Sequence, residues 1–267
     1  MLSLPIGISD FREIIEKQCD YVDKTLFIRD ILEDRAKTIL LTRPRRFGKT
    51  LNMMTLKYFL DLKENSKALF KNLNIEKETA LCQQHQNQYP VIYLTLKDIK
   101  ELSYERMYGM FQLLIAEWYR EHRHLMETLN DPEEQALFHR YLARETSLDE
   151  NKQSLRFLSH VLSRHYNQKV FILIDEYDTP IHASYMENYY KDCMDFMRGF
   201  FGAALKDNVA LEKCVMTGIL RIAQESIFSD LNNVSCYTVL NKFYADYFGF
   251  TQAEVNALAQ KANMENH

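Results

Sequence analysis

Glycine and proline are scarce in this chain of 267 residues, with seven of the first and five of the second. A fold of many short strands needs turns at close intervals, so this scarcity argues against it and favours long helices with short connections. The sequence has no apolar run near the roughly 18 residues that a membrane span requires. Its first ten residues lack the basic start and apolar stretch of a secretory signal. We therefore expect a cytoplasmic protein with no membrane partner.

Cysteine and net charge are also limited. The five cysteines are widely spaced and none forms a Cys-x-x-Cys pair, which indicates thiols of a reducing compartment rather than a disulfide framework or a zinc site. The formal charge is −4, so net charge alone would not hold the protein on nucleic acid, although a local basic patch could contribute. An apolar fraction of 46% is ordinary for a globular chain.

Five short apolar runs stand between stretches with the apolar spacing of helices. Near-continuous runs of this kind are typical of strands that are buried on both faces. Their alternation with helices predicts an α/β fold, with a mainly parallel five-stranded sheet flanked by helices. A mostly helical insert at about residues 101–167, interrupted at Asp131 and Pro132, separates the second strand from the third. The predicted strands are residues 38–42, 91–96, 170–174, 214–217 and 234–239.

The most specific motif is RPRRFGKT at residues 43–50, directly after the first predicted strand and before a helical stretch. Its last three positions match the phosphate loop Gly-x-x-x-x-Gly-Lys-Ser/Thr, whereas Arg43 stands in place of the first glycine. Gly48 lets the backbone approach a phosphate, Lys49 reaches the outer phosphates, and Thr50 places its hydroxyl on Mg²⁺. The residues predicted to bind the nucleotide are Arg45, Arg46, Phe47, Gly48, Lys49, Thr50 and Leu51.

The three arginines of this loop have two interpretations. Arg43, Arg45 and Arg46 either form a solvated basic loop or face a nucleotide, a nucleic acid or an acidic partner. The residue types alone do not decide between them, so contact with DNA or RNA is one of several alternatives.

The third predicted strand ends in Asp175 and Glu176. An apolar strand that ends in two acids is the Walker B pattern, in which the first acid belongs to the Mg²⁺ shell and the second orients the attacking water. Thr50 and Asp175 are therefore the predicted metal residues, and Lys49 and Glu176 are predicted to be catalytic. A solvated acidic turn would explain the two acids alone, but their position 125 residues after Thr50 in a phosphate loop favours function. The pair indicates a phosphate-loop NTPase of the catalytic-glutamate type.

Two further candidates, Thr217 and Arg221, follow the fourth predicted strand. In this class of protein that strand usually lies between the phosphate-loop strand and the Walker B strand. Thr217 at its end would then lie near the γ-phosphate, and Arg221 could add positive charge to a catalytic set. Two plainer interpretations stay open, because Thr217 also suits a strand end and Arg221 suits an exposed surface.

These motifs belong to longer stretches at residues 5–11, 21–25, 43–50, 90–100, 171–180, 217–233 and 247–251. Together the stretches resemble the bacterial AAA-ATPase-like family, whose members often carry a C-terminal nuclease-like domain of the PD-(D/E)XK type. The resemblance implies an AAA/STAND-like fold, ATP with Mg²⁺ as ligands, and a position near the nucleotide base for residues 21–25. The family's phosphate loop itself begins with arginine, so the resemblance also implies that Arg43 is a family trait.

The resemblance predicts how the chain is divided. We expect residues 1–240 to form the NTPase domain and residues 241–267 to begin a C-terminal lid or linker that is cut short, without the nuclease-like domain. Asp98 and Lys100 have the Asp-x-Lys form of a nuclease motif. The chain contains no Pro-Asp dipeptide to supply the partner acid, so a polar strand end explains these two residues better.

Two functions of different classes fit the sequence. The first is a Mg²⁺-dependent ATPase that drives or gates a process connected with nucleic acid, defence or mobile elements, with a homo-oligomer as one form. The second is a nucleotide-gated binding module with little or no hydrolysis, which acts as the regulatory part of a nuclease. Glu176 favours hydrolysis, and the acidic net charge weighs against autonomous binding of DNA.

Overall fold

In the described part of the chain, the sheet at the centre of the molecule has five strands, and every neighbouring pair is parallel. A computed structural model describes residues 3–219 and 234–262. The strand order is β2-β3-β4-β1-β5, so the predicted α/β fold is confirmed and the sheet is entirely parallel. The strands are β1 (Thr38–Thr42), β2 (Val91–Thr95), β3 (Val170–Asp175), β4 (Leu211–Gly218) and β5 (Val234–Tyr237).

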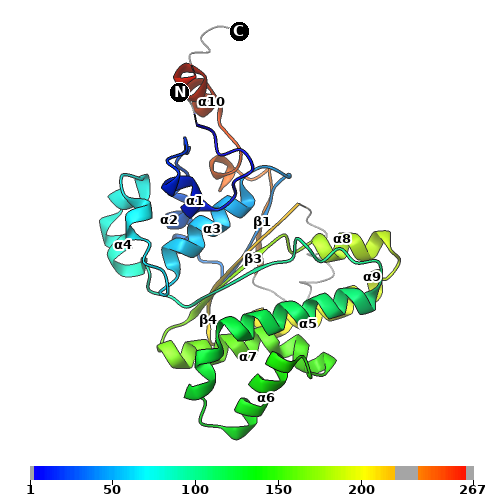
Figure 1. The fold of residues 1–267 in the computed structure, drawn as a ribbon. Helices are drawn as coiled ribbons and strands as arrows, with labels where there is room; N and C mark the ends of the chain where they lie inside the picture. The colour runs from blue at the N-terminus through cyan, green and yellow to red at the C-terminus, as the bar shows by residue number, and fades with distance from the viewer. Residues whose placement is uncertain (1–2, 220–233, 263–267) are drawn as a thin grey trace.

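Helices cover both faces of this sheet (Figure 1). Helices α1, α2 and α3 pack on one face, and α5, α7 and α9 pack on the other. The α-helices are α1 (Phe11–Glu16), α2 (Phe27–Glu33), α3 (Lys49–Leu60), α4 (Thr79–His85), α5 (Tyr104–Glu121), α6 (Pro132–Ala143), α7 (Leu148–Tyr166), α8 (Thr179–Met186), α9 (Tyr190–Leu205) and α10 (Gln252–Lys261). The described ranges also contain four short 3₁₀ helices, which are η1 (Lys67–Phe70), η2 (Asn74–Lys77), η3 (Arg123–Thr128) and η4 (Ala245–Tyr247).

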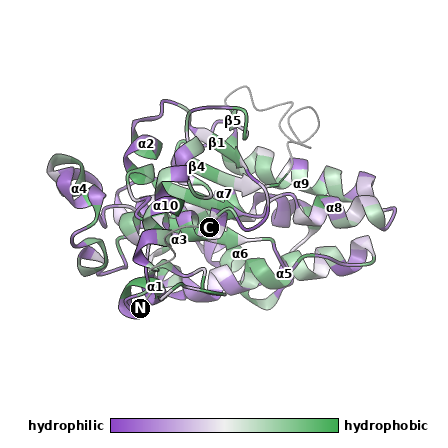
Figure 2. Ribbon diagram, turned by 90° about the horizontal axis from the view of Figure 1, so that it is seen from above, coloured by the Kyte–Doolittle hydropathy of each residue, from purple (hydrophilic) through white to green (hydrophobic). Residues whose placement is uncertain are grey.

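The strands supply apolar side chains to both layers of helices. Along β3, Phe171 and Leu173 belong to the core under α1–α3, whereas Ile172 and Ile174 belong to the core under α5, α7 and α9. Successive side chains of a strand point to opposite faces, so a continuous apolar run is what a doubly covered strand needs. Figure 2 shows the hydrophobic strands β1 and β4 in the middle of the molecule.

The predicted helical insert lies between β2 and β3 and contains α5, η3, α6 and α7. Asp131 caps α6, since its carboxylate accepts a hydrogen bond from the backbone N–H of Glu133 at 2.9 Å, and Pro132 follows as the first helical residue. Ser147 and Glu150 form a reciprocal capping box at the start of α7. These local signals explain why the insert breaks at the predicted place.

The carboxyl ends of the parallel strands meet at one edge of the sheet. At the end of β4, a Cβ atom on Gly218 would lie 2.5 Å from the ring of Tyr177 and 2.8 Å from a carboxylate oxygen of Asp178. Glycine therefore allows the ends of β3 and β4 to approach each other closely. Among the described residues, no helix combines the length and the apolar character that crossing a membrane would take.

Candidate active site

The phosphate loop joins the buried strand β1 to α3. Gly48 is the N-cap of α3 and has a φ of +80°, a conformation that glycine adopts without strain. It provides no side-chain cap, and the first turn of α3 carries no acidic residue. The N–H groups and the positive end of the helix dipole are therefore left for an anion.

Two hydroxyl groups converge on the carboxylate of Asp175 at the end of β3. Thr50 Oγ1 donates a hydrogen bond to Asp175 Oδ2 at 2.6 Å, and the hydroxyl of Thr217 donates to Asp175 Oδ1. Asp175 is only 1% exposed and Thr217 is fully buried. The contact exists because β4 lies between β1 and β3, as predicted, so residues that are far apart in sequence meet at one edge of the sheet.

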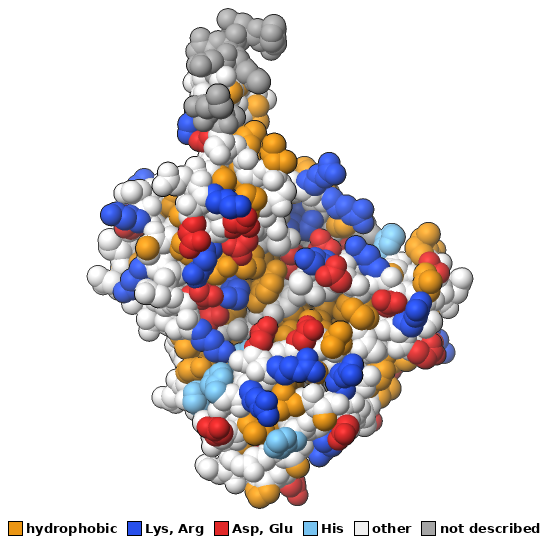
Figure 3. Space-filling view, viewed as in Figure 1, with side chains coloured by type: hydrophobic (Ala, Val, Ile, Leu, Met, Phe, Trp, Pro, Cys, Tyr) orange, Lys and Arg blue, Asp and Glu red, His pale blue; other side chains and the backbone are white. Residues whose placement is uncertain are grey.

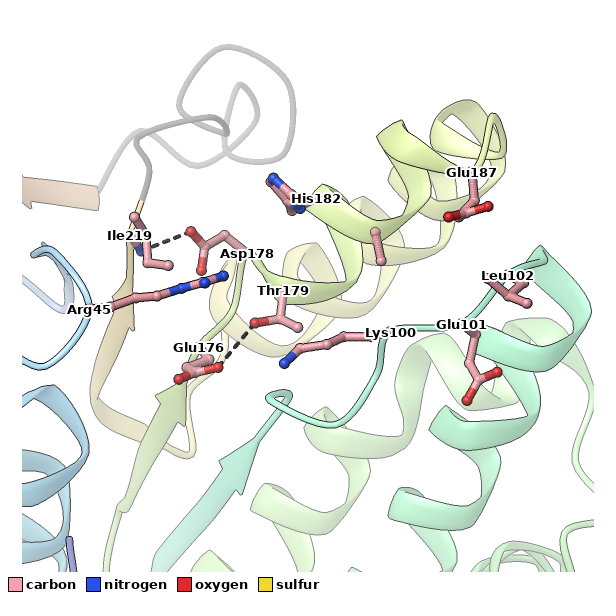
Figure 4. A pocket seen from close by; sticks show the side chains of 11 residues that line it. Arg45, Lys100, Glu101, Leu102, Glu176, Asp178, Thr179, His182, Glu187 and Ile219 are labelled. Atoms are coloured by element: carbon pink, nitrogen blue, oxygen red, sulfur yellow. Dashed lines mark hydrogen bonds between the residues drawn. The ribbon is translucent and has the colours of Figure 1, made fainter. Parts of the chain in front are cut away.

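Glu176, the next residue, lines a cavity that Asp175 does not line. It has a φ of +54°, which is uncommon for a residue with a side chain, and its carboxylate accepts a hydrogen bond from Thr179 Oγ1 at 3.3 Å. Figure 4 shows Glu176, Arg45 and Lys100 pointing from three segments into a cavity of about 670 Å³. Asp175 thus faces the phosphate loop, whereas Glu176 borders an open cavity beside it.

Lys49 lies along its own loop. Its ammonium group donates hydrogen bonds to the backbone oxygens of Arg43 at 3.1 Å and Pro44 at 2.9 Å. Burial lowers the pKa of this ammonium, and the carboxylates of Asp175 and Glu176 act in the opposite direction. Among the described residues its ammonium donates to neutral carbonyl groups, and an anion that replaced them would add an attraction between opposite charges.

The three loop arginines face three different surroundings. Arg43 is buried and donates to the backbone oxygen of Tyr237 in β5 at 2.8 Å. Arg45 is exposed and borders the cavity of Glu176. Arg46 is also exposed and lines another cavity. The sequence grouped these residues as one basic loop, but the fold separates them.

The cavity beside Arg46 has a volume of about 260 Å³ and lies against the phosphate loop. The stretch at residues 21–25, expected near the base, contributes Tyr21, Val22 and Lys24. Four of the predicted nucleotide-binding residues and four residues near the C-terminus complete much of its wall: Arg46, Phe47, Gly48, Leu51, Tyr247, Gly249, Phe250 and Leu258. Its mixture of aromatic and polar walls suits a planar polar ring.

Charged side chains of both signs are mixed on the face shown in Figure 3. Apolar side chains line the hollow between the upper and lower parts of this face. A face with mixed charges offers no extended basic footprint for a nucleic-acid backbone. This view gives no support to the DNA or RNA contact that the loop arginines left open.

Several predicted residues need a separate account. Arg221 lies outside the described residues. Asp98 is exposed and its backbone oxygen accepts from the N–H of Lys100 at 3.0 Å, as in an ordinary polar turn after a strand. All five cysteines lie within the described part of the chain, and they form no disulfide bond there.

Sequence reasoning missed the contacts between the loop and the C-terminal region. Asn52 Nδ2 donates to the backbone oxygen of Tyr247 at 2.8 Å, and the N–H of Gly249 donates to the backbone oxygen of Phe47 at 3.1 Å. It also missed the bond from Thr179, the first residue of α8, to Glu176. No local sequence pattern predicts such contacts, because nearly 200 residues separate Asn52 from Tyr247.

The fold and these residues define a protein of the phosphate-loop NTPase class. A family model described as predicted AAA-ATPase matches residues 5–228, which is most of the chain. The chain therefore belongs to the AAA-ATPase-like family, and the resemblance seen in its motifs is confirmed.

A curated relative extends well beyond this chain. It is described as an uncharacterized protein in the vnfD 5′ region of Azotobacter chroococcum mcd 1, and it is 27% identical over 264 residues. The alignment covers 96% of this chain but 44% of that protein, so the chain spans less than half of the relative's length.

Proposed function

We propose that this chain binds ATP together with Mg²⁺ at the carboxyl edge of the sheet and hydrolyses it. The observation that carries the proposal is the convergence of Thr50 and Thr217 on the buried carboxylate of Asp175, next to Lys49 and the free start of α3. Loop amides and an ammonium group that surround one point are suited to phosphate oxygens. The family described as predicted AAA-ATPase supports the same activity.

The residues fit Mg²⁺. Thr50 and Asp175 offer oxygen atoms 2.6 Å apart, and Mg²⁺ prefers oxygen ligands. The Thr50 hydroxyl donates its hydrogen bond to Asp175, which leaves the lone pairs of Thr50 Oγ1 free for a cation. Mg²⁺ usually takes only one or two protein ligands and completes its shell with water and phosphate, so a protein-only cluster is not needed. Within the described ranges, no group of three or more His, Cys, Asp or Glu could hold a metal.

Each residue then has a distinct role. Lys49 and the amides at the start of α3 hold the phosphates, and bound Mg²⁺ would neutralise part of their charge. Glu176 accepts a proton from the attacking water, and Thr179 holds its carboxylate in place before that. Tyr21 and its neighbours in the cavity of about 260 Å³ receive the base. Water and ATP give ADP and phosphate, and the water proton leaves through Glu176.

A nucleotide-gated module with little hydrolysis is the second candidate. It is favoured by Glu176, whose carboxylate is bonded to Thr179 and borders the separate cavity. In this version the carboxylate stays there when nucleotide is bound, and the ATP state controls a partner such as a nuclease. The two candidates share the binding site and differ only in what Glu176 does.

Substitution of Glu176 separates the two candidates. Glu176→Gln keeps the shape and removes the charge, so it should leave Mg-ATP affinity unchanged and slow hydrolysis by about 100-fold or more. Asp175→Asn should instead weaken the Mg²⁺-dependent part of ATP binding. The rate is measured in single turnovers with protein in excess over ATP. Glu187→Gln is the matched control, because Glu187 lines the same cavity and is exposed. Equal, slow hydrolysis by wild type and Glu176→Gln would select the nucleotide-gated module.

A further inference from the structure

The C-terminal segment, defined as residues 234–261, is fastened to the phosphate loop. The hydrogen bond from Asn52 to Tyr247 joins this segment to the first turns of α3. The hydrogen bond from Gly249 to Phe47 joins it to the phosphate loop. The contact is tight, since a Cβ atom on Gly249 would lie 3.1 Å from the ring of Phe47, and Gly249 has a φ of +72°. The loop and the segment therefore form one continuous surface.

Arg43 makes a third and deeper connection. Its Nη1 donates both to the backbone oxygen of Thr42 at 2.9 Å and to that of Tyr237 at 2.8 Å. The centre of its guanidinium lies 4.9 Å from the centre of the Phe248 ring, within the range of a cation–π contact. One side chain thus contacts β1, β5 and Phe248 in the bend that follows η4.

This arrangement costs free energy. Arg43 is 2% exposed, its Nη2 has no hydrogen-bond partner among the described residues, and burial lowers the pKa of its guanidinium. A buried charge with an unpaired N–H lowers the stability of the fold. An arginine at this position therefore calls for a role other than filling space. The backbone of Arg43 does not have a positive φ, so this position does not need the glycine of the usual motif.

Lys49 connects this position to the nucleotide. Its ammonium donates to the backbone oxygens of Arg43 and Pro44, the residues at the start of the loop. A Lys49 side chain that turned to a phosphate would release the backbone oxygens of Arg43 and Pro44, and this would allow the peptide between these two residues to shift. A change at Arg43 then reaches Tyr237 and Phe248 directly through the side chain.

We infer that Arg43 is a positioning residue that couples nucleotide binding at the loop to the docking of the C-terminal segment. The inference rests on the proposed function for the identity of the ligand. Coupling is reciprocal, so a firmly docked segment also tightens nucleotide binding. This coupling explains why the first position of the loop is arginine, since its side chain links the nucleotide site to the C-terminal segment.

Hydrogen exchange measured by mass spectrometry tests this coupling. In wild type, saturating Mg-ATP should slow exchange in peptides that cover residues 237–254 by about fivefold or more, the lower end of ordinary site-to-site coupling. Arg43→Gly, which restores the usual motif, should bind Mg-ATP in calorimetry but lose most of this slowing. Arg43→Lys, which keeps one charged donor, should recover part of it. Arg35→Gly is the control, because Arg35 is exposed at the opposite end of β1.

The outcomes separate this inference from the proposed function. Slowing of equal size in wild type and in Arg43→Gly would overturn the coupling. If wild type binds no Mg-ATP, the proposed function fails. Hydrogen exchange without nucleotide then still tests whether Arg43 holds the C-terminal segment in place. Arg43→Gly should then exchange the Gly249 amide several-fold faster than wild type, and equal rates would refute the link. If Arg43→Gly does not fold, Phe248→Leu removes the ring beside the guanidinium, and an undiminished ATP effect there would also refute it.

Discussion

At the scale of single residues, Lys49 shows how one charge is kept ready for a ligand. Its ammonium is buried, bonded to two backbone oxygens, and 6% exposed as a residue. Neutral carbonyl groups stabilise the charge less than phosphate oxygens would, because the attraction between opposite charges adds to the hydrogen bond. The free energy gained by exchanging these partners is available for binding.

Lys49→Ala should therefore weaken Mg-ATP binding. Loss of a charge-assisted contact of roughly 1.5–3 kcal/mol corresponds to about 10- to 100-fold in affinity. Titration calorimetry at constant Mg²⁺ measures this directly. Lys71→Ala removes an exposed lysine of the same chain and should bind as wild type does. A folded Lys49→Ala variant of unchanged affinity would remove Lys49 from the binding site.

The residues of the loop and of the strand ends could be predicted from sequence because each lies in a short, continuous motif. Thr50 and Asp175 are predictable for this reason, and their contact follows once β4 is placed between β1 and β3. The role of Arg43 could not be predicted. Its side chain contacts Tyr237, which is 194 residues away, and only the folded chain brings the two together.

At the scale of elements, the strands and long helices follow from apolar periodicity, but their exact ends do not. The sequence predicts the fourth strand at residues 214–217, whereas β4 spans Leu211–Gly218. The extra residues pair with β1 and β3, and this stabilisation by neighbouring strands is invisible in a local pattern. Gly218 likewise reads as a loop residue, yet it lies within the strand, where a side chain would collide with Tyr177.

Gly218→Ala should destabilise the protein by about 1–3 kcal/mol, the usual cost of forcing extra volume into a packed site. Gly109→Ala is the matched control, since a Cβ there meets nothing within 4 Å and Gly109 lies inside α5. That change should stabilise the protein by about 0.5–1 kcal/mol, because alanine loses less entropy than glycine in a helix. Urea unfolding with an unchanged m-value distinguishes them. Equal stability of both variants would mean that the Tyr177 ring moves aside without lowering the free energy of unfolding.

At the scale of the whole molecule, two hydrophobic cores lie on opposite faces of one sheet and support different parts of the protein. The core under α1, α2 and α3 carries the phosphate loop, and the other core carries the helical insert. The predicted boundary between residues 240 and 241 stays a prediction. The contacts of α10 with the N-terminal region, through Lys24 with Glu254 at 2.5 Å and through Lys261 with Asp20, do show that the described end of the chain is packed against its beginning.

The second core also contains a buried group whose titration affects global stability. His122, at the end of α5, is 5% exposed, and its Nδ1–H donates to the backbone oxygen of Trp118 at 2.8 Å. Burial, with a smaller effect of the Lys63 charge, lowers the pKa of His122 to about 4, from 6.5 for an ordinary histidine. Between these two values the unfolded chain binds the proton and the folded chain does not. The free energy of unfolding must therefore fall as the pH falls through this window.

The prediction is that wild type loses on the order of 1 kcal/mol between pH 7.5 and pH 5.5 through His122 alone. Burial also lowers the pKa values of His85, His124 and His160, so the total loss will be larger. His122→Asn keeps a donor for Trp118 and removes the titration, so the difference between the two proteins isolates His122. Urea unfolding at both pH values measures it. The variant should lose less stability than wild type on acidification, and an equal loss in both would show that the pKa of His122 is the same in the folded and the unfolded chain.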